Sequence, residues 1–358
     1  MGLGSTEVEF ACGKRMKNRF MLAPLTNCQS NDDGTLSDEE FNWLTLRAKG
    51  EFGLTMTCAA HVQQIGQGFP GQLGIFSDDH LVGHRRLAEA IKSENSLAVA
   101  QLHHAGMRSP AALIGIAPVC PSMDEETGAR AMTLDEVKQL RDDFIAAAVR
   151  SWQAGYDGVE IHGAHGYILC QFLSELYNRR DDEYGGSLEN RARILFEIVR
   201  GVRKACGPEF LLGVRLSPER FGIRLAEALD VCEQLIAGGE VDFLDISLWD
   251  SFKLPEEEAY QGSSLLSHFA RLPRGKVLLT VAGKIMTAEQ VQDVLAADVD
   301  FVTIGRGAIL HHDYPRRVMN DDRFEPVSLP VSRAHLAQEG LSERFIEYMG
   351  GWKGFVAD

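Results

Sequence analysis

The sequence lacks basic clusters, paired cysteines and long apolar runs, and each absence excludes a class of protein. Its 51 acidic and 36 basic side chains give a formal net charge of −15, which argues against nucleic-acid partners. The seven cysteines occur singly, without a C-x-x-C pair, so we expect reduced thiols and a cytoplasmic location. No apolar run approaches the ~20 residues of a membrane span, and the first residues do not resemble a secretion signal. We therefore expect no membrane partner.

Linker-like stretches and internal repeats are also absent. No Pro/Ser-rich segment, charge block or regular repeat marks a boundary between domains. The 358 residues have 45% apolar content, which is enough for one large core. We expect a single domain over residues 1–358.

Short apolar runs alternate with amphipathic stretches along the whole chain. Eight continuous apolar runs with helices between them predict an α/β fold, a closed (β/α)8 TIM barrel of parallel strands. The runs cover residues 19–25, 54–62, 97–104, 158–165, 210–217, 243–247, 277–284 and 301–307. The expected helices cover residues 37–49, 79–94, 133–153, 188–204, 225–237 and 287–296, and Ser37, Thr133 and Thr287 are suitable caps.

Polar side chains gather where these runs end. Barrel active sites lie at the carboxyl ends of the strands, so this one-sided placement indicates a ligand site. The residues concerned are Thr26, His61, Gln101, His103, His104, His162, His165, Arg215, Gly283, Lys284, Gly305 and Arg306. The last four lie at the ends of the seventh and eighth runs, where barrels often bind phosphate through glycine N–H groups and a basic side chain.

The fourth run carries the most informative residues. His162, His165 and Tyr167 follow one another within six positions. Two imidazoles can donate hydrogen bonds to a substrate oxygen, and a phenol beside them can supply a proton.

Several motifs together resemble the old yellow enzyme family of FMN-dependent NAD(P)H:flavin oxidoreductases and ene-reductases. They are APLT at 23–26, QLHHAGMRS at 101–109, the His162/His165/Tyr167 segment, NRRDDEYGGSLENRAR at 178–193 and IGRG at 304–307. The resemblance covers nearly the whole chain in order. It implies FMN as the cofactor and NADPH or NADH as the electron donor, and the sequence does not discriminate between the two donors.

The resemblance also implies a role for each matching residue. The flavin ring would lie along Pro24, Leu25, Thr26, Ala59 and Gln101, with Arg215 near N1 and O2 and the phosphate at Gly283, Gly305 and Arg306. His162 and His165 would polarise the oxygen of an α,β-unsaturated carbonyl or nitro compound. Hydride would pass from flavin N5, and Tyr167 would protonate the other carbon in a ping-pong cycle.

Three positions are candidates for the substrate pocket. Cys28 stands where many relatives carry a tyrosine, and Trp249 and Trp352 are candidate pocket walls. Residues 105–132 form a long aperiodic segment that we expect to cap the barrel. Residues 320–358 form a C-terminal tail, whose aromatics either dock on their own barrel or complete a neighbouring protomer's site.

Several alternatives stay open on sequence alone. The chain could be a dienoyl-CoA-reductase-like or other flavin oxidoreductase of the same barrel family, a flavin-binding protein without turnover, or a flavin-free barrel lyase or isomerase that uses Arg215 and Lys284. We expect no metal, because the pairs His103/His104 and His311/His312 point to opposite faces of an extended chain. We read residues 178–183 as a loop-holding network. A small-molecule substrate is expected, a homo-oligomer is a possibility, and the natural substrate stays open.

Overall fold

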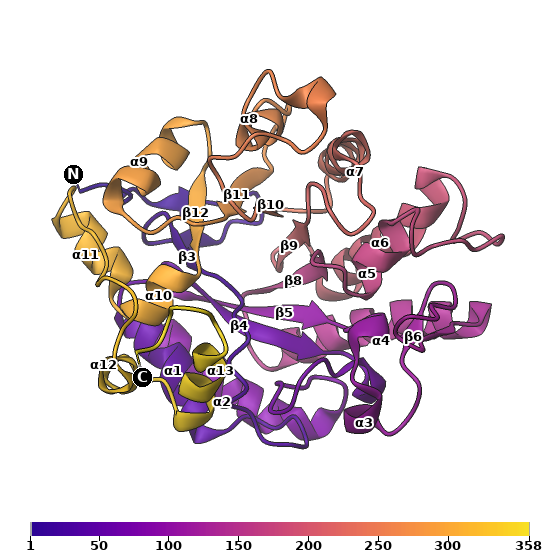
Figure 1. Cartoon of the computed structure of the whole chain (residues 1–358), viewed down its shortest axis with the longest axis horizontal. Helices are drawn as coiled ribbons and strands as arrows, with labels where there is room; N and C mark the ends of the chain where they lie inside the picture. Colours follow the sequence, from indigo (N-terminus) through magenta and orange to yellow (C-terminus); the bar gives the residue numbers. More distant parts are fainter. Residues whose placement is uncertain (1, 358) are drawn as a thin grey trace.

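Eight parallel strands close into a barrel in the computed structural model, which describes residues 2–357 (Figure 1). Around the barrel the strands follow chain order, and the last pairs with the first. They are β3 (Phe20–Leu22), β4 (Leu54–His61), β5 (Leu97–His103), β8 (Gly158–Gly163), β9 (Leu211–Leu216), β10 (Phe243–Ser247), β11 (Leu278–Ala282) and β12 (Phe301–Ile304). Each predicted run contains one strand, so the predicted (β/α)8 barrel is confirmed.

The strand register decides which polar side chains become neighbours. His162 on β8 pairs with Arg215 on β9, and Gln101 on β5 pairs with Glu160 on β8. These strands are buried along almost their whole length, as expected for a parallel sheet covered by helices. The polar residues at their ends are therefore held on rigid backbone.

All six predicted helices are present around the barrel. They are α1 (Asp38–Lys49), α2 (Leu81–Ser93), α4 (Leu134–Gln153), α6 (Leu188–Cys206), α7 (Leu225–Gly238) and α9 (Ala288–Ala296). Ser37, Thr133 and Thr287 each accept a backbone N–H from the first turn of the helix that follows. The predicted caps are confirmed at all three positions.

Shorter elements, which the sequence did not reveal, fill the connections. The α-helices among them are α3 (Ala111–Ile114), α5 (Ile168–Leu173), α8 (Leu265–Ala270), α10 (Arg306–Leu310), α11 (Tyr314–Asn320), α12 (Arg333–Gln338) and α13 (Glu343–Gly350). The 3-10 turns are η1 (Gln64–Gly66), η2 (Asp78–His80), η3 (Gly106–Arg108) and η4 (Glu258–Tyr260). Most of them are too short for a helical period to appear in the sequence.

An antiparallel hairpin lies at the amino end of the barrel. It consists of β1 (Val8–Glu9) and β2 (Arg15–Met16). Phe10 follows β1 and packs against Phe243 and Phe301, with ring centroids 5.9 and 5.7 Å away. Because Phe243 and Phe301 are the first residues of β10 and β12, the hairpin closes the floor of the barrel.

Two further segments are added to the barrel. Residues 105–132 hold α3, β6 (Val119–Cys120) and β7 (Arg130–Ala131). The tail carries α12 and α13, which lie beside α1 in Figure 1, and Phe345 of α13 packs edge-on against Trp43 of α1 at 5.5 Å. Within residues 2–357, no helix combines the length and apolar character that a membrane crossing requires.

Candidate active site

A cavity of about 810 Å³ lies at the carboxyl ends of the strands. Nearly every residue predicted for the site lines it. These residues are Pro24, Leu25, Thr26, Ala59, Gln101, His162, His165, Tyr167, Arg215, Trp249, Gly283, Gly305, Arg306 and Trp352. Cys28 does not line the cavity. The barrel thus brings together residues that are as much as 328 positions apart in the sequence.

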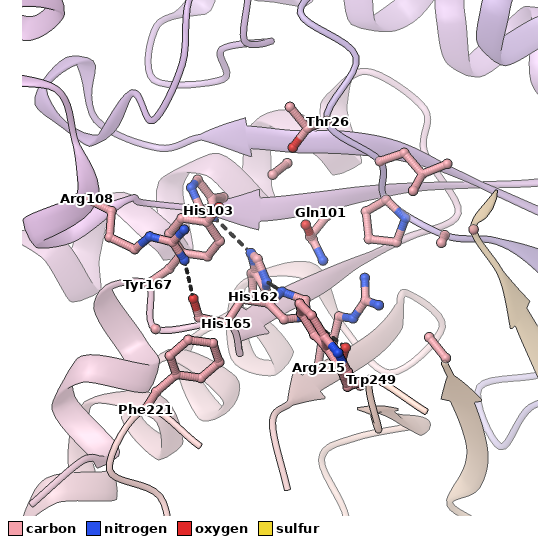
Figure 2. Close-up of a pocket in the computed structure, with 18 of the residues that line it drawn as sticks. Thr26, Gln101, His103, Arg108, His162, His165, Tyr167, Arg215, Phe221 and Trp249 are labelled. Atoms are coloured by element: carbon pink, nitrogen blue, oxygen red, sulfur yellow. Dashed lines mark hydrogen bonds between the residues drawn. The ribbon is translucent and has the colours of Figure 1, made fainter. Parts of the chain in front are cut away.

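Three histidines and a serine form one hydrogen-bonded chain in this cavity, and Figure 2 shows the three histidines. His103 Nδ1 lies 2.8 Å from His162 Nδ1, and His162 Nε2 lies 2.8 Å from His165 Nδ1. His165 Nε2 lies 2.7 Å from the hydroxyl of Ser247. Burial, helped by neighbouring positive groups, holds the pKa of His162 and His165 well below the ordinary histidine value. Both rings are therefore neutral at physiological pH, and each has one N–H to donate.

Tyr167 stands beside the histidines at the start of α5. Its ring centroid lies 4.4 Å from that of His103 and 5.2 Å from that of His162. The guanidinium of Arg108 covers the Tyr167 ring at 4.6 Å and donates a hydrogen bond to the carbonyl of His165. Figure 2 shows Arg108, Tyr167 and the histidines as one group. Arg108 belongs to the QLHHAGMRS motif, but its position over the phenol could not be predicted from that motif.

Two buried carboxyl groups lie near Arg215. Arg215 Nε is 3.1 Å from Asp245 Oδ2, and the amide nitrogen of Gln101 donates to Glu160 at 2.8 Å. Glu160 and Asp245 are both fully buried. Burial and then the nearby Asp245 raise the pKa of Glu160, and burial also raises the pKa of Asp245 despite the opposing effect of Arg215. The Arg215 cation is thus paired with Asp245 and lies near Glu160, and these two carboxyl groups resist ionising together.

The opposite end of the cavity is suited to an anion. Gly283, Lys284, Gly305 and Arg306 line it after β11 and β12. Gly283 has a φ of +155°, and a side chain there would come within 3.0 Å of the backbone nitrogens of Asp250 and Ser251. Only glycine fits this approach. Lys284 is paired with Asp250 at 2.8 Å, whereas Arg306 makes no ion pair within residues 2–357.

The walls of the cavity come from the two added segments and from the loops after β9 and β10. The capping segment contributes Met107, Arg108, Asp124, Glu126 and Thr127, and the tail contributes Tyr348, Met349 and Trp352. Trp352 lines the cavity of its own chain, with 39% of its surface exposed. At the rim, the Arg220 guanidinium lies 4.4 Å from the ring centre of Trp249.

Tyr348 is the pocket residue that sequence reasoning missed as a functional candidate. Its phenol lies beside Thr26 and Trp352, and burial raises its pKa. Cys28 has a φ of +57° and is half-buried behind this wall. The polar group near Thr26 therefore comes from α13 and not from position 28. The only sign of Tyr348 in the sequence was the aromatic content of the tail.

Two other charged clusters lie outside the cavity. Asn178 donates to the carbonyls of Phe172 and Tyr184, and Arg180 pairs with Asp182 at 2.5 Å. These contacts agree with a loop-holding network.

His311, His335 and Glu339 have candidate ligand atoms within 4.8 Å of one another. However, His311 Nε2 accepts the Val327 N–H, so the proton of the neutral ring sits on Nδ1. Neither nitrogen of His311 then offers a free lone pair to a metal.

Comparison with known proteins identifies the family. A family model described as NADH:flavin oxidoreductase / NADH oxidase family matches residues 10–323. The probable NADH-dependent flavin oxidoreductase YqiG of Bacillus subtilis (strain 168) is 35% identical over 320 residues, which are 86% of this chain and 86% of that protein. The old yellow enzyme homologue from Zymomonas mobilis is 27% identical, with a TM-score of 0.81 over 96% of this chain and 99% of that chain.

Some relatives are much longer than this chain. The NADH:fumarate oxidoreductase of Klebsiella pneumoniae (strain 342) is 32% identical, and the match covers 87% of this chain but only 35% of that protein. The shared part is therefore the barrel.

The fold and these comparisons define a flavin-dependent oxidoreductase built on a (β/α)8 barrel. The chain belongs to the NADH:flavin oxidoreductase / NADH oxidase family, and its structure is similar to that of an old yellow enzyme homologue. Its cofactor is FMN, and NADH or NADPH supplies the electrons.

The cavity fits FMN chemically. One end offers a glycine that tolerates no side chain, together with the cation of Arg306, and these suit a phosphate. The other end offers the amide of Gln101, the hydroxyl of Thr26 and the cation of Arg215, which suit the polar edge of a flavin ring.

Proposed function

We propose that this protein reduces activated C=C bonds of α,β-unsaturated carbonyl or nitro compounds, with NADPH or NADH as the donor. The observation that carries the proposal is the arrangement of two neutral imidazoles and a phenol in the flavin cavity. Such compounds need hydrogen-bond donors at their oxygen and a proton at the carbon next to the activating group. The cavity contains both.

His162 and His165 would bind the substrate oxygen. Each neutral ring can direct one N–H at the oxygen, where negative charge develops as hydride arrives at the β-carbon. The low pKa of both rings keeps them neutral, so they stabilise that charge without giving up a proton. Tyr167 would then protonate the α-carbon, since a phenol is protonated at physiological pH.

The other cavity residues would hold the cofactor. Gly283, Gly305 and Arg306 would bind the FMN phosphate, and Pro24, Leu25, Thr26, Ala59, Gln101 and Arg215 would surround the ring. When bound, FMN supplies hydride transfer between the nicotinamide donor and the substrate. Because the same cavity would hold both the flavin ring and the substrate-binding histidines, we expect donor and substrate to use it in turn, as in a ping-pong cycle.

The two half-reactions can be measured separately. Purified holoprotein mixed anaerobically with NADPH or NADH should lose its flavin absorption, and cyclohexenone should restore it. The double variant His162→Ala/His165→Ala should retain FMN but lose about 10²-fold or more of the reoxidation rate, because both oxygen ligands are gone. Reoxidation of this variant at the wild-type rate would contradict the proposed role of the histidines.

A further inference from the structure

We propose that His103 is a positioning residue that keeps the proton of His162 on Nε2, so that the His162/His165 pair presents hydrogen-bond donors to the substrate. This inference rests on the proposed function and adds a residue to it. His103 lies on the neighbouring strand β5, unlike His162 and His165. Its ring contacts the Nδ1 edge of the His162 ring.

The proposal starts from the burial of the three rings. His103 and His162 are 1% and 4% exposed. Their rings are tilted by 32° with centroids 5.0 Å apart, and the Nδ1 atoms are in hydrogen-bond contact. The charged and titratable groups around the two rings are His61, His104, His165, Tyr167, Arg108 and Arg215. The positive members of this set and the burial both oppose protonation, so His103 and His162 are neutral.

A chain of neutral rings can be ordered in only two ways. Each ring has one N–H and one lone pair, so reversing one hydrogen bond reverses all of them. In the first order, His103 donates to His162, His162 donates from Nε2 to His165, and His165 donates from Nε2 to Ser247. In the second order, Ser247 donates to His165 and every later bond runs the other way.

Only the first order suits a substrate oxygen. It places N–H groups on the Nε2 atoms of both His162 and His165, which can exchange their bonds to His165 and Ser247 for bonds to a substrate oxygen. The second order places lone pairs there, which would repel an oxygen. In the first order the Nδ1 lone pair of His162 is buried and needs a donor. The Nδ1 atom of His103, 2.8 Å away, is placed to supply that donor when it carries the proton of its ring. A buried acceptor without a donor is costly, so the productive order requires His103 to hold its own proton on Nδ1, and this is the state that we propose for it.

Two substitutions of similar size, one that donates a hydrogen bond and one that only accepts, test the direction of the hydrogen-bonded chain. His103→Asn keeps a side-chain N–H near the position of Nδ1, whereas His103→Asp offers only an acceptor and pulls the His162 proton onto Nδ1. With holoenzyme, we expect the Asn variant to bind the non-reducible ketone cyclohexanone nearly as tightly as wild type at pH 8. The Asp variant should bind it about 10- to 100-fold more weakly. Binding is read from the flavin difference spectrum.

The pH dependence separates positioning from packing. The Asp variant should regain ketone affinity as pH falls, because protonation of His162 restores an N–H on Nε2, while the Asn variant should show no such gain. If both variants lose affinity equally at every pH, His103 only fills space and the proposal is wrong. FMN content and melting temperature, measured for both variants, establish that the comparison is between folded holoenzymes.

A direct readout does not depend on substrate. In wild-type holoenzyme labelled with ¹⁵N on its histidine rings, the His162 signal, assigned by its loss in His162→Gln, should show a protonated Nε2 and an unprotonated Nδ1. Protonated Nδ1 would overturn the proposal. If the tautomer is as expected but no enone reoxidises the flavin, the proposed function fails and the tautomer assignment stands.

Discussion

Tyr167 shows how little freedom the site residues have. The phenol is placed by its position directly before α5, by the edge of the His103 ring and by the guanidinium of Arg108. His165 has a φ of +62°, an uncommon conformation for a residue other than glycine. This conformation is maintained by the backbone N–H bond to Ser217 and by the ring bond to Ser247. Such a well-supported group is suited to one fixed substrate geometry.

Replacing Tyr167 with Phe tests the proton donor. We expect the rate of flavin reduction by the nicotinamide donor to change little, because that half-reaction needs no proton from the phenol. Reoxidation by cyclohexenone should slow by about 10²- to 10⁴-fold, the usual contribution of a general acid. Anaerobic stopped-flow spectroscopy measures both rates. Tyr260→Phe, which lies outside the cavity, serves as the control, and equal slowing of both half-reactions would argue against proton donation.

The buried carboxyl pair predicts how stability varies with pH. The raised pKa of Glu160 means that the folded chain retains a proton which the unfolded chain releases above its ordinary pKa of 4.5. Stability should therefore fall as pH rises above that value, by about 1.4 kcal/mol for each unit of pKa shift. Asp245 contributes with the same sign. In Glu160→Gln this fall should be reduced in denaturant unfolding measured from pH 5 to 9.

An exposed carboxylate supplies the control for that measurement. Glu89 lies on the solvent side of α2, so Glu89→Gln should keep the wild-type pH dependence. If Glu160→Gln and Glu89→Gln vary with pH in the same way, Glu160 does not retain a proton in the folded state.

At the residue scale, the sequence could predict which side chains lie together, but not their contacts. His162, His165, Tyr167 and Arg215 all line one cavity. Contacts such as that between His103 and His162 depend on ring orientations across two strands, which no spacing rule encodes. Glu160 was not among the predicted site residues, because its neighbours Asp245 and Arg215 lie on β10 and β9 and meet it only after the barrel closes.

At the level of elements, long periodic segments were predictable and short ones were not. The eight strands and six longer helices follow from apolar runs and capping residues. Helices such as α10, with five residues, contain too little sequence to show an amphipathic period. The hairpin of β1 and β2 has two residues in each strand. Tertiary contacts, and not local propensity, stabilise elements of this size.

The C-terminal helix α13 makes a testable contribution to the cavity of its own chain. A chain that ends at Leu341 loses Tyr348, Met349 and Trp352 from the wall, and it exposes Trp43, on which Phe345 packs. We expect ketone affinity to fall by about tenfold, which corresponds to about 1.4 kcal/mol. The expected measurement is the same flavin difference titration.

Co-expression of two variants tests whether the tail completes the cavity of its own chain or that of a neighbouring chain. The truncated chain, co-expressed with full-length His162→Ala/His165→Ala, should show no more turnover than the sum of the two expressed alone. Recovered turnover would mean that the tail of the inactive chain completes the site of the truncated one, and our assignment of Trp352 to its own cavity would then be wrong.

The two ends of the barrel have different roles in the whole molecule, one in chemistry and the other in stability. The cavity occupies the carboxyl end, whereas Phe10, Phe243 and Phe301 fill the amino end. Gly213 on β9 contributes to this packing, because a side chain there would come within 2.1 Å of the Phe243 ring. In barrels of this kind, changes at the amino end are expected to affect stability and changes at the carboxyl end to affect activity.

Phe10→Ala tests that separation. The ring is 2% exposed and contacts two strand starts, so its removal leaves a cavity in the barrel floor and should cost about 3–5 kcal/mol of unfolding free energy. Since the floor does not contact the histidines, the rates of both half-reactions and the ketone affinity should remain near wild type at temperatures where the variant is folded. Phe252→Ala is the matched control, because Phe252 is 43% exposed and should cost far less. A fall in reoxidation rate in Phe10→Ala, with FMN content unchanged, would show that floor and mouth are coupled, and the division between stability and chemistry would not hold.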